Sequence, residues 1–320
     1  MRVIHNVSNP DITIELFGMK MDAPIFAAPI TGTTLNMGGK ISERDYIEPV
    51  VKGCIDSGVY AMVGDTAVDE FLLENLSVLK EYNGQGIVFI KPWENDDIIN
   101  KIKLAEESNA IAVGVDIDAC GLVTLSMHGK KVVPKTVEDL RKLKNSTKLP
   151  FIVKGIMTVE DALMAVEAGV DAIVISNHGG RVLDCTPGVC EVIPSIAKAV
   201  KGKITILADG GVRTGVDVVK MIGLGADAVL IGRPFVTASF GGKTDGVKTY
   251  VENIKNELTH LQKLIIMVDL SDAKIETLSY DIKDNWLSIY LTPKHGLLTK
   301  NELRTAQSTY KYDLIITLDT

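Results

Sequence analysis

Short apolar runs alternate with longer amphipathic segments along the first 263 residues of the chain. The runs lie at Pro24–Ala28, Val59–Val63, Ile87–Ile90, Ile111–Val115, Phe151–Val153, Ala172–Ile175, Ile204–Leu207 and Ala228–Ile231. Because a short run that is apolar throughout fits a strand covered on both faces, each run predicts a strand of a parallel sheet. The segments between them, such as Glu43–Ser57 and Thr158–Ala168, have apolar residues at three- and four-residue intervals, which indicates helices.

This alternation predicts the fold class, because strands that alternate with helices form parallel sheets. Eight such units within about 250 residues favour a closed (β/α)₈ barrel, the TIM barrel, over an open doubly wound sheet. The open sheet stays as the alternative, because periodicity alone does not show whether a sheet closes. The pairs Thr136 with Asp139 and Thr158 with Asp161 have the spacing of helix N-terminal caps.

The last 57 residues break the alternation. Four β-rich segments, separated by polar turns, lie at Leu264–Leu270, Ile275–Tyr280, Trp286–Thr292 and Leu314–Leu318. They predict a β-rich extension over residues 264–320, beside a barrel that occupies residues 1–263. We interpret the extension as either a small domain or a truncated or fused fragment, and an unpaired sheet edge in it would favour self-association.

Composition and charge exclude several classes of protein. The chain has 34 Lys and Arg against 41 Asp and Glu, a net charge of −7, whereas a nucleic-acid-binding protein needs a basic face. No apolar stretch is long enough to span a membrane, and the N-terminus has no apolar run of a secretory signal. The four cysteines have neither disulfide-scaffold nor zinc-site spacing, so we expect reduced thiols and no metal site. A cytoplasmic enzyme or binding protein is the expectation that remains.

The loops after the seventh and eighth predicted strands combine glycines with arginines. Functional residues of such a barrel lie where the strands end. Gly210-Gly211 is followed by Arg213 and by a helix that opens at Thr214-Gly215, and Gly232-Arg233 repeats the combination one strand later. Free backbone amides, a helix N-terminus and guanidinium groups predict a phosphate site. The alternative is that these glycines only form tight turns.

Residues at the ends of three other strands predict a reaction centre. His178 can accept and return a proton near neutral pH, and Arg181 offers a planar fork for a carboxylate. Lys154 ends the fifth strand and could stabilise negative charge that develops on an electron-rich ring. Asp116 ends the fourth strand and could accept a hydrogen bond from His178, although a helix cap is an equal alternative for this residue.

Four segments at the ends of the later strands form one pattern. They are Val153-Lys154-Gly155-Ile156, Ser176-Asn177-His178-Gly179-Gly180-Arg181-Val182-Leu183-Asp184, Asp209-Gly210-Gly211-Val212-Arg213-Thr214-Gly215 and Ile231-Gly232-Arg233-Pro234. Together they resemble the FMN-dependent α-hydroxy-acid oxidase and dehydrogenase family, which includes lactate and glycolate oxidases. The Ser-Asn-His-Gly-Gly-Arg motif is highly specific, whereas the Asp-Gly-Gly and Gly-Arg-Pro elements occur in several phosphate-binding barrels. The likeness is strong over residues 110–242 and weaker over residues 10–109.

The resemblance implies an FMN cofactor and the oxidation of a small 2-hydroxy acid to the 2-oxo acid. It implies cofactor-binding positions at Pro29, Ile30, Thr31, Lys154, Ser176, Asp209, Gly210, Gly211, Val212, Arg213, Gly232 and Arg233. It implies His178 as the base, with Asp116 as its partner, and Arg181 as the clamp on the substrate carboxylate. Lys154 would lie beside the N1–C2=O edge of the flavin. The family also implies a homo-oligomer, a tetramer, and leaves oxygen, a quinone or a protein as the electron acceptor.

The sequence departs from the family pattern at several places, and alternatives stay open. Ile90-Lys91-Pro92-Trp93 stands where the family has Gln-Leu-Tyr, and Gly114 stands where a threonine is usual. The alternatives are another flavin barrel enzyme, such as a type 2 isopentenyl-diphosphate isomerase, and a catalytically impaired flavin-binding protein. Residues 264–320 resemble instead a piece of a DHH-type phosphoesterase that lacks the Asp-His-His triplet, so we expect no phosphoesterase activity from them.

Overall fold

The computed structural model of the protein describes residues 10–122, 125, 127–259, 263–268, 274–283, 286–295 and 303–308. The chain divides into two compact units. The larger unit consists of Asp11–Leu258, and the described strands beyond residue 259 belong to the other unit.

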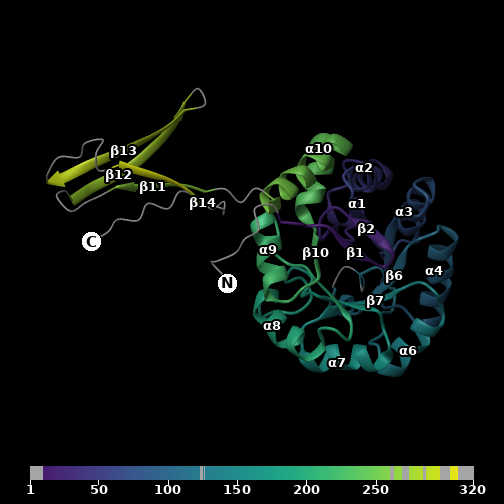
Figure 1. The fold of residues 1–320 in the computed structure, drawn as a ribbon. Coiled ribbons are helices and arrows are strands. Elements are labelled where there is room, and N and C mark those ends of the chain that lie inside the picture. The colour runs from purple at the N-terminus through teal and green to yellow at the C-terminus, as the bar shows by residue number, and fades with distance from the viewer. Residues whose placement is uncertain are drawn as a thin grey trace. The chain divides into compact units, whose positions relative to one another are not determined.

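Eight parallel strands form a closed barrel in the larger unit (Figure 1). They are β3 (Ile25–Ala27), β4 (Tyr60–Val63), β5 (Gly86–Ile90), β6 (Ala112–Asp116), β7 (Phe151–Ile156), β8 (Ala172–Ile175), β9 (Thr205–Ala208) and β10 (Ala228–Ile231). Each strand pairs with the next, and the ring closes where Val229 of β10 lies opposite Ile25 of β3. The predicted (β/α)₈ barrel is confirmed, and the open sheet is excluded.

A helix follows each barrel strand and packs on the outside of the ring (Figure 1). These helices are α2 (Glu43–Asp56), α3 (Asp69–Glu81), α4 (Asn95–Glu107), α6 (Val137–Asn145), α7 (Val159–Ala168), α8 (Val189–Val200), α9 (Gly215–Leu224) and α10 (Arg233–Thr259). A short α1 (Thr33–Asn36) precedes α2, and the 3₁₀-helix η1 (Ile117–Gly121) follows β6. Both predicted caps are present, since Thr136 and Thr158 accept from the backbone N–H groups three residues on.

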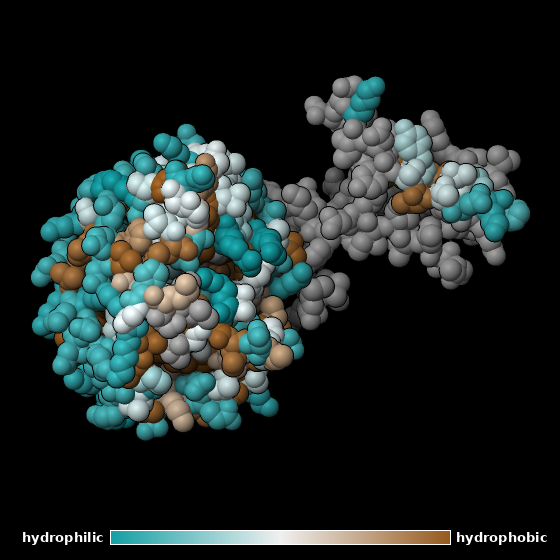
Figure 2. All heavy atoms as spheres, turned by 180° about the vertical axis from the view of Figure 1, so that it is seen from behind, coloured by the Kyte–Doolittle hydropathy of each residue, from teal (hydrophilic) through white to brown (hydrophobic). Residues whose placement is uncertain are grey.

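The end of the barrel that Figure 2 shows is largely polar. Hydrophilic residues predominate there, with groups of hydrophobic residues between them. Among the described helices, none has the length and apolar character that crossing a membrane requires. The apolar residues of these helices instead pack inward against the strands, in one large core cluster.

A small hairpin closes the barrel interior at the amino-terminal ends of the strands. Its strands are β1 (Ile14–Leu16) and β2 (Met19–Met21), and the sequence patterns did not predict it. Met21 is completely buried and packs in one cluster with the inward-facing side chains of Phe26 and Phe89. Because apolar side chains fill this end, a ligand cavity is expected at the opposite, carboxyl end of the strands.

The extension contains two antiparallel strand pairs, which confirms its predicted β-rich character. In it β11 (Lys263–Val268) pairs with β14 (Leu303–Ser308), and β12 (Lys274–Lys283) pairs with β13 (Trp286–His295). The first three predicted strands of this region correspond to β11, β12 and β13. The fourth, Leu314–Leu318, lies outside the described residues, and β14 was not predicted.

Candidate active site

A cavity of about 660 Å³ lies at the carboxyl ends of the barrel strands. Its lining includes the predicted site residues Pro29, Ile30, Thr31, Asp116, Lys154, His178, Arg181, Asp209, Gly210, Gly211, Val212, Arg213, Gly232 and Arg233. Ser176 is the predicted residue that does not belong to the lining. The volume lies within the range of small-molecule sites. The fold therefore brings residues from all parts of the barrel sequence to one cavity.

A network of buried charges centres on Asp116, at the end of β6. One carboxylate oxygen lies 2.6 Å from Lys91 Nζ, and the other lies 3.1 Å from Lys154 Nζ. Burial alone would raise the pKa of Asp116, but the two ammonium groups hold this pKa well below its ordinary value. Asp116 is therefore an anion held between two cations. Its side chain does not cap η1, which argues against the alternative role.

Lys154 links this network to the end of β9. Its Nζ atom also lies 3.7 Å from Asp209 Oδ2. Burial opposes a charge on Lys154, but the carboxylates of Asp116 and Asp209 raise its pKa, so the group stays an ammonium. The second oxygen of Asp209, Oδ1, is buried and has no hydrogen-bond partner among the described residues. An unpartnered acceptor in the wall of a cavity fits a ligand that carries a hydroxyl group.

His178 follows β8 in a turn of left-handed residues. The φ angle is 56° at His178, 68° at Gly179 and 75° at Gly180. The backbone N–H of His178 donates to the Ser176 hydroxyl at 3.1 Å, which fixes the start of the turn. A non-glycine residue with positive φ is strained, and such strain concentrates at functional sites. Ser176 thus acts on the turn that carries the histidine.

Asp118, in η1, is a site residue that the sequence analysis did not assign. Its Oδ1 atom lies 3.1 Å from His178 Nδ1, whereas Asp116 Oδ1 lies 3.6 Å from the same nitrogen. Burial, together with the negative charge of Asp116, raises the pKa of Asp118 to about 8. Burial lowers the pKa of His178 to about 3, so the imidazole is neutral. The available signal was the second acidic residue in Asp116-Ile117-Asp118, directly after a strand.

These three side chains are close enough to share a metal ion. Ligand atoms of Asp116, Asp118 and His178 lie within 4.8 Å of one another. However, the ammonium groups of Lys91 and Lys154 contact the same Asp116 carboxylate, and a metal cation would have to bind beside both positive charges. The arrangement therefore favours proton transfer over metal binding.

The loops after β9 and β10 carry the features of the predicted phosphate site. Gly210 and Gly211 have φ angles of 96° and 77°, which residues with side chains rarely adopt. Arg213 and Arg233 line the cavity, and neither guanidinium group forms an ion pair with a residue that the structure describes. Two unpaired cations beside a glycine turn are suited to an anionic ligand.

The start of α9 does not offer the free amides that the sequence predicted. The backbone N–H groups of Arg213 and Thr214 both donate to Asp217 Oδ2 at 3.1 Å. The N–H of Gly215 donates to Glu257. This part of the prediction was wrong, because carboxylates of the chain itself already satisfy these donors. Of the predicted phosphate site, the glycine turn and the arginine side chains are the groups that could still bind an anion.

Two other predicted site residues, Arg181 and Thr31, differ in how far their side chains are engaged by neighbouring residues. Arg181 is exposed at the cavity, where its guanidinium group donates to Asn36 Oδ1 at 3.3 Å. Thr31 also lines the cavity, but its hydroxyl donates to Glu43 and accepts from Asn75 at 3.0 Å. Arg181 is thus available for a ligand, whereas the Thr31 side chain holds its own loop in place.

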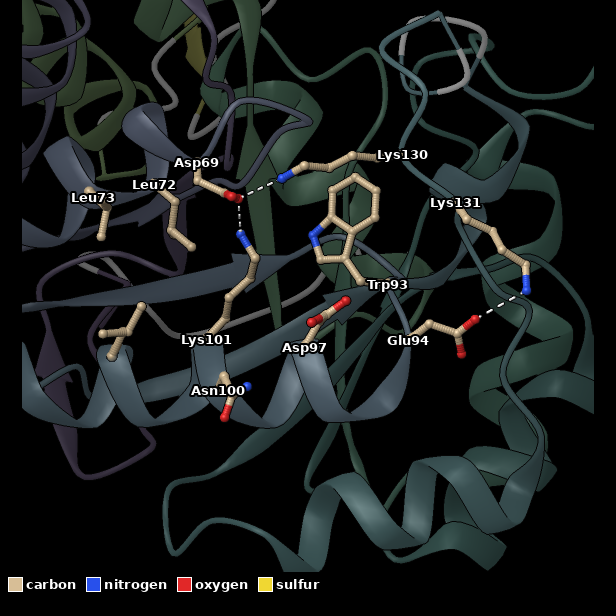
Figure 3. A pocket seen from close by; sticks show the side chains of 11 residues that line it. Asp69, Leu72, Leu73, Trp93, Glu94, Asp97, Asn100, Lys101, Lys130 and Lys131 are labelled. Carbon is tan, nitrogen blue, oxygen red and sulfur yellow. Dashed lines mark hydrogen bonds and ion pairs between the residues drawn. The ribbon is translucent and has the colours of Figure 1, made fainter.

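A second pocket, of about 580 Å³, lies between α3 and α4 (Figure 3). Figure 3 shows Lys101 and Lys130 reaching Asp69, at 2.7 and 2.8 Å. Lys101 also lies 3.0 Å from the buried Asp65, which accepts from Trp93 Nε1 at 2.6 Å. Asp69 and the neighbouring Asp65 neutralise these lysines. The hydrogen bond from Trp93 to Asp65 connects the ends of β5 and β4, and the pocket offers little free charge to a ligand.

Comparisons with known proteins relate the chain to flavin enzymes. Residues 124–279 match the model of the FMN-dependent dehydrogenase family. The chain is 33% identical over 292 residues to a peroxisomal (S)-2-hydroxyacid oxidase of Arabidopsis thaliana. The aligned region covers 80% of this chain and 77% of that protein. It is 40% identical over 305 residues to an L-lactate oxidase of Lactobacillus jensenii, with coverages of 87% and 75%.

A solved structure of mandelate oxidase has the same architecture. It superposes with a TM-score of 0.68 at 26% sequence identity, over 80% of this chain and 79% of that one. These matches give no support to the predicted likeness of residues 264–320 to a DHH-type phosphoesterase, and the family model itself extends to residue 279.

Proposed function

The chain belongs to the family of FMN-dependent α-hydroxy-acid oxidases and dehydrogenases, and we propose that it oxidises a small 2-hydroxy acid of the lactate or glycolate type to the 2-oxo acid. FMN is its cofactor. The observation that carries the proposal is that His178, Arg181 and Lys154 line one cavity. A base, a carboxylate-binding fork and a buried cation are the groups that this oxidation requires.

The residues of the cavity fit FMN. The unpaired guanidinium groups of Arg213 and Arg233 and the turn at Gly210-Gly211 would hold the phosphate. Asp209 Oδ1, a buried acceptor without a partner in the described chain, would accept from a hydroxyl of the ribityl chain. Lys154 would neutralise negative charge on the isoalloxazine ring. When bound, FMN supplies the acceptor for the two electrons that leave the substrate.

The substrate groups are assigned to the two polar side chains of the turn after β8. Arg181 would bind the substrate carboxylate through two parallel hydrogen bonds. Conversion of the C2 alcohol to a carbonyl group releases two electrons and two protons. His178 would take one of the protons, and the other would leave with the two electrons to the acceptor that bound FMN supplies. The histidine is neutral before the reaction, because burial lowers its pKa to about 3. Asp116 would stabilise the imidazolium that forms.

An anaerobic spectral titration of the FMN-loaded protein tests the proposal. Addition of L-lactate or glycolate should bleach the absorbance of oxidised FMN. Mandelate distinguishes a small-substrate site from one that accepts an aromatic side chain. As a matched control, 3-hydroxypropionate has a carboxylate and an alcohol but no hydroxyl at C2, and it should leave the spectrum unchanged. An oxidised spectrum that persists with every 2-hydroxy acid would overturn the proposal.

A further inference from the structure

Two carboxylates approach His178 from the end of β6, at different distances. Asp118 Oδ1 lies 3.1 Å from Nδ1, within hydrogen-bond range. Asp116 Oδ1 lies 3.6 Å from Nδ1, which is too far for a hydrogen bond. Only one of the two is therefore placed to decide which ring nitrogen carries the proton.

The two carboxylates also differ in their other partners. Each oxygen of Asp116 has an ammonium donor, since Oδ2 lies 2.6 Å from Lys91 Nζ and Oδ1 lies 3.1 Å from Lys154 Nζ. Asp118 forms no ion pair with a lysine that the structure describes: its side-chain neighbours are His178 and the Asp116 carboxylate, whose negative charge raises the pKa of Asp118, and its Oδ2 atom is buried without a hydrogen-bond partner in the described part of the chain. Asp116 therefore anchors the lysines, whereas Asp118 contacts the histidine at hydrogen-bond distance.

The backbone of β7 makes room for Asp118. The pairing of β7 with β8 shifts its register between Lys154 and Ile156, which places a bulge at Gly155. Gly155 has a φ of +105°, and a Cβ atom at this position would lie 2.6 Å from the Cβ of Asp118. Any larger residue at position 155 would displace Asp118. The neighbouring strand is thus shaped to accept this carboxylate next to Lys154.

We infer that Asp118, rather than Asp116, is the positioning residue of His178, and that it accepts a hydrogen bond from Nδ1–H so that Nε2 is left unprotonated as the base. The inference rests on the proposed function, in which His178 removes the proton. The group that accepts from one imidazole nitrogen determines the tautomer, and an amide in its place can impose the wrong one. The role left to Asp116 is to hold Lys91 and Lys154 in place by its two ion pairs.

The test is the tautomer of His178, read from ring ¹⁵N chemical shifts of FMN-loaded, histidine-labelled protein. The spectra are recorded at a pH of about 9, where the neutral ring is the form observed. His178 is assigned by comparison with His178→Gln. We expect the Nδ1–H tautomer in the wild type and in Asp116→Asn, and the Nε2–H tautomer in Asp118→Asn. Retention of Nδ1–H in Asp118→Asn, or its loss in Asp116→Asn alone, overturns the inference.

Two further measurements keep the test decisive. Asp118→Ala removes the acceptor altogether, should also lose the Nδ1–H preference, and replaces Asp118→Asn if that variant does not fold. In stopped-flow reduction, Asp118→Asn should lower the limiting rate on the order of 10²–10⁴-fold with little change in substrate affinity. The ring spectra need no substrate. If no 2-hydroxy acid reduces the FMN, the proposed function fails, while the tautomer assignment is still decided by its own spectrum.

Discussion

The two halves of the barrel present different chemistry to the same cavity. The ends of β8–β10 carry a histidine in a strained turn, left-handed glycines and two arginines without ion-pair partners among the described residues. The ends of β4–β6 carry Asp65, Lys91 and Asp116, which are buried or nearly so and are paired with one another or with nearby residues. The second half is therefore free to bind ligands, whereas the first half neutralises its own charges and supports the site.

Lys154, on β7, joins the two halves. It contacts Asp116 of the first half at 3.1 Å and Asp209 of the second half at 3.7 Å. A buried charge is costly unless it is paired, so a supporting network of this kind holds its members in fixed positions. Substitutions in the second half should therefore affect chemistry and FMN binding, and substitutions of the paired lysines in the first half should affect stability, whereas Asp118, which contacts His178, should affect the chemistry.

The largest effect is expected in the second half, for His178→Asn. Loss of a general base typically costs about 10²–10⁴-fold in rate, so kcat/KM for lactate or glycolate should fall by that factor. FMN should remain bound, because no phosphate-binding group is changed. Steady-state kinetics and the absorbance spectrum of the purified variant measure both outcomes. Unchanged reduction kinetics would show that His178 is not the base.

Arg213→Met should weaken FMN binding without changing the fold. A hydrogen bond to a charged group contributes about 1.5–3 kcal/mol, so the dissociation constant of FMN should rise by roughly 10–150-fold. Quenching of FMN fluorescence during titration of the FMN-free protein measures this constant. The control is Arg44→Met, since Arg44 lies on α2 and is paired with glutamates outside the cavity. Equal effects of the two substitutions would contradict the phosphate site.

Lys91→Met should act on stability. It removes one of the two cations of a buried carboxylate, while Lys154 remains, so we expect the free energy of unfolding to fall by about 1–2 kcal/mol. Lys131→Met is the matched control, because Lys131 is 79% exposed and its pair with Glu94 should contribute less than about 1 kcal/mol. Equilibrium unfolding in urea compares the two. If the Lys91→Met variant is as stable as the control, the ion pair of Lys91 with Asp116 does not contribute to the free energy of unfolding.

The same division explains how far the sequence predicts the site. The turn at His178 and the loop at Gly210-Gly211 are encoded by adjacent residues, so local motifs reveal them. The pair of Lys91 with Asp116 joins positions 25 residues apart, and it depends on which strand ends become neighbours in the barrel. Asp118 was overlooked for a related reason, since its partner His178 is 60 residues away. Ion pairs and hydrogen bonds between strands require the register, which no local pattern contains.

Other differences have local causes. The strands of the β1–β2 hairpin have three residues each, too few for an alternating pattern to be recognised. The amides at the start of α9 were expected to be free, although Thr214 and Asp217 have the spacing of a capping box, and the structure contains that box. In contrast, the barrel strands were predictable because both faces are buried and each run is apolar throughout.

The smallest expected effect is a pH dependence carried by Asp118, which follows β6 in the first half and contacts His178 of the second half. Burial and the negative charge of Asp116 raise the pKa of Asp118 to about 8, against the opposing effect of the ammonium groups of Lys154 and Lys91. Below this pH the carboxyl is protonated, and above it the carboxylate accepts more strongly from the His178 ring and stabilises its positive charge. The basicity of the histidine therefore increases as the pH rises through about 8.

It follows that kcat/KM should rise with pH across this range, by up to about tenfold, with an apparent midpoint that belongs to the coupled group of Asp116, Asp118 and His178. The rise should be absent in Asp118→Asn, whose side chain does not ionise, and should persist in Arg213→Met at saturating FMN. A profile that is flat or falls in the wild type contradicts the prediction. A rise that survives in Asp118→Asn assigns the ionisation to another group, and the first half of the barrel would then support the histidine without tuning it.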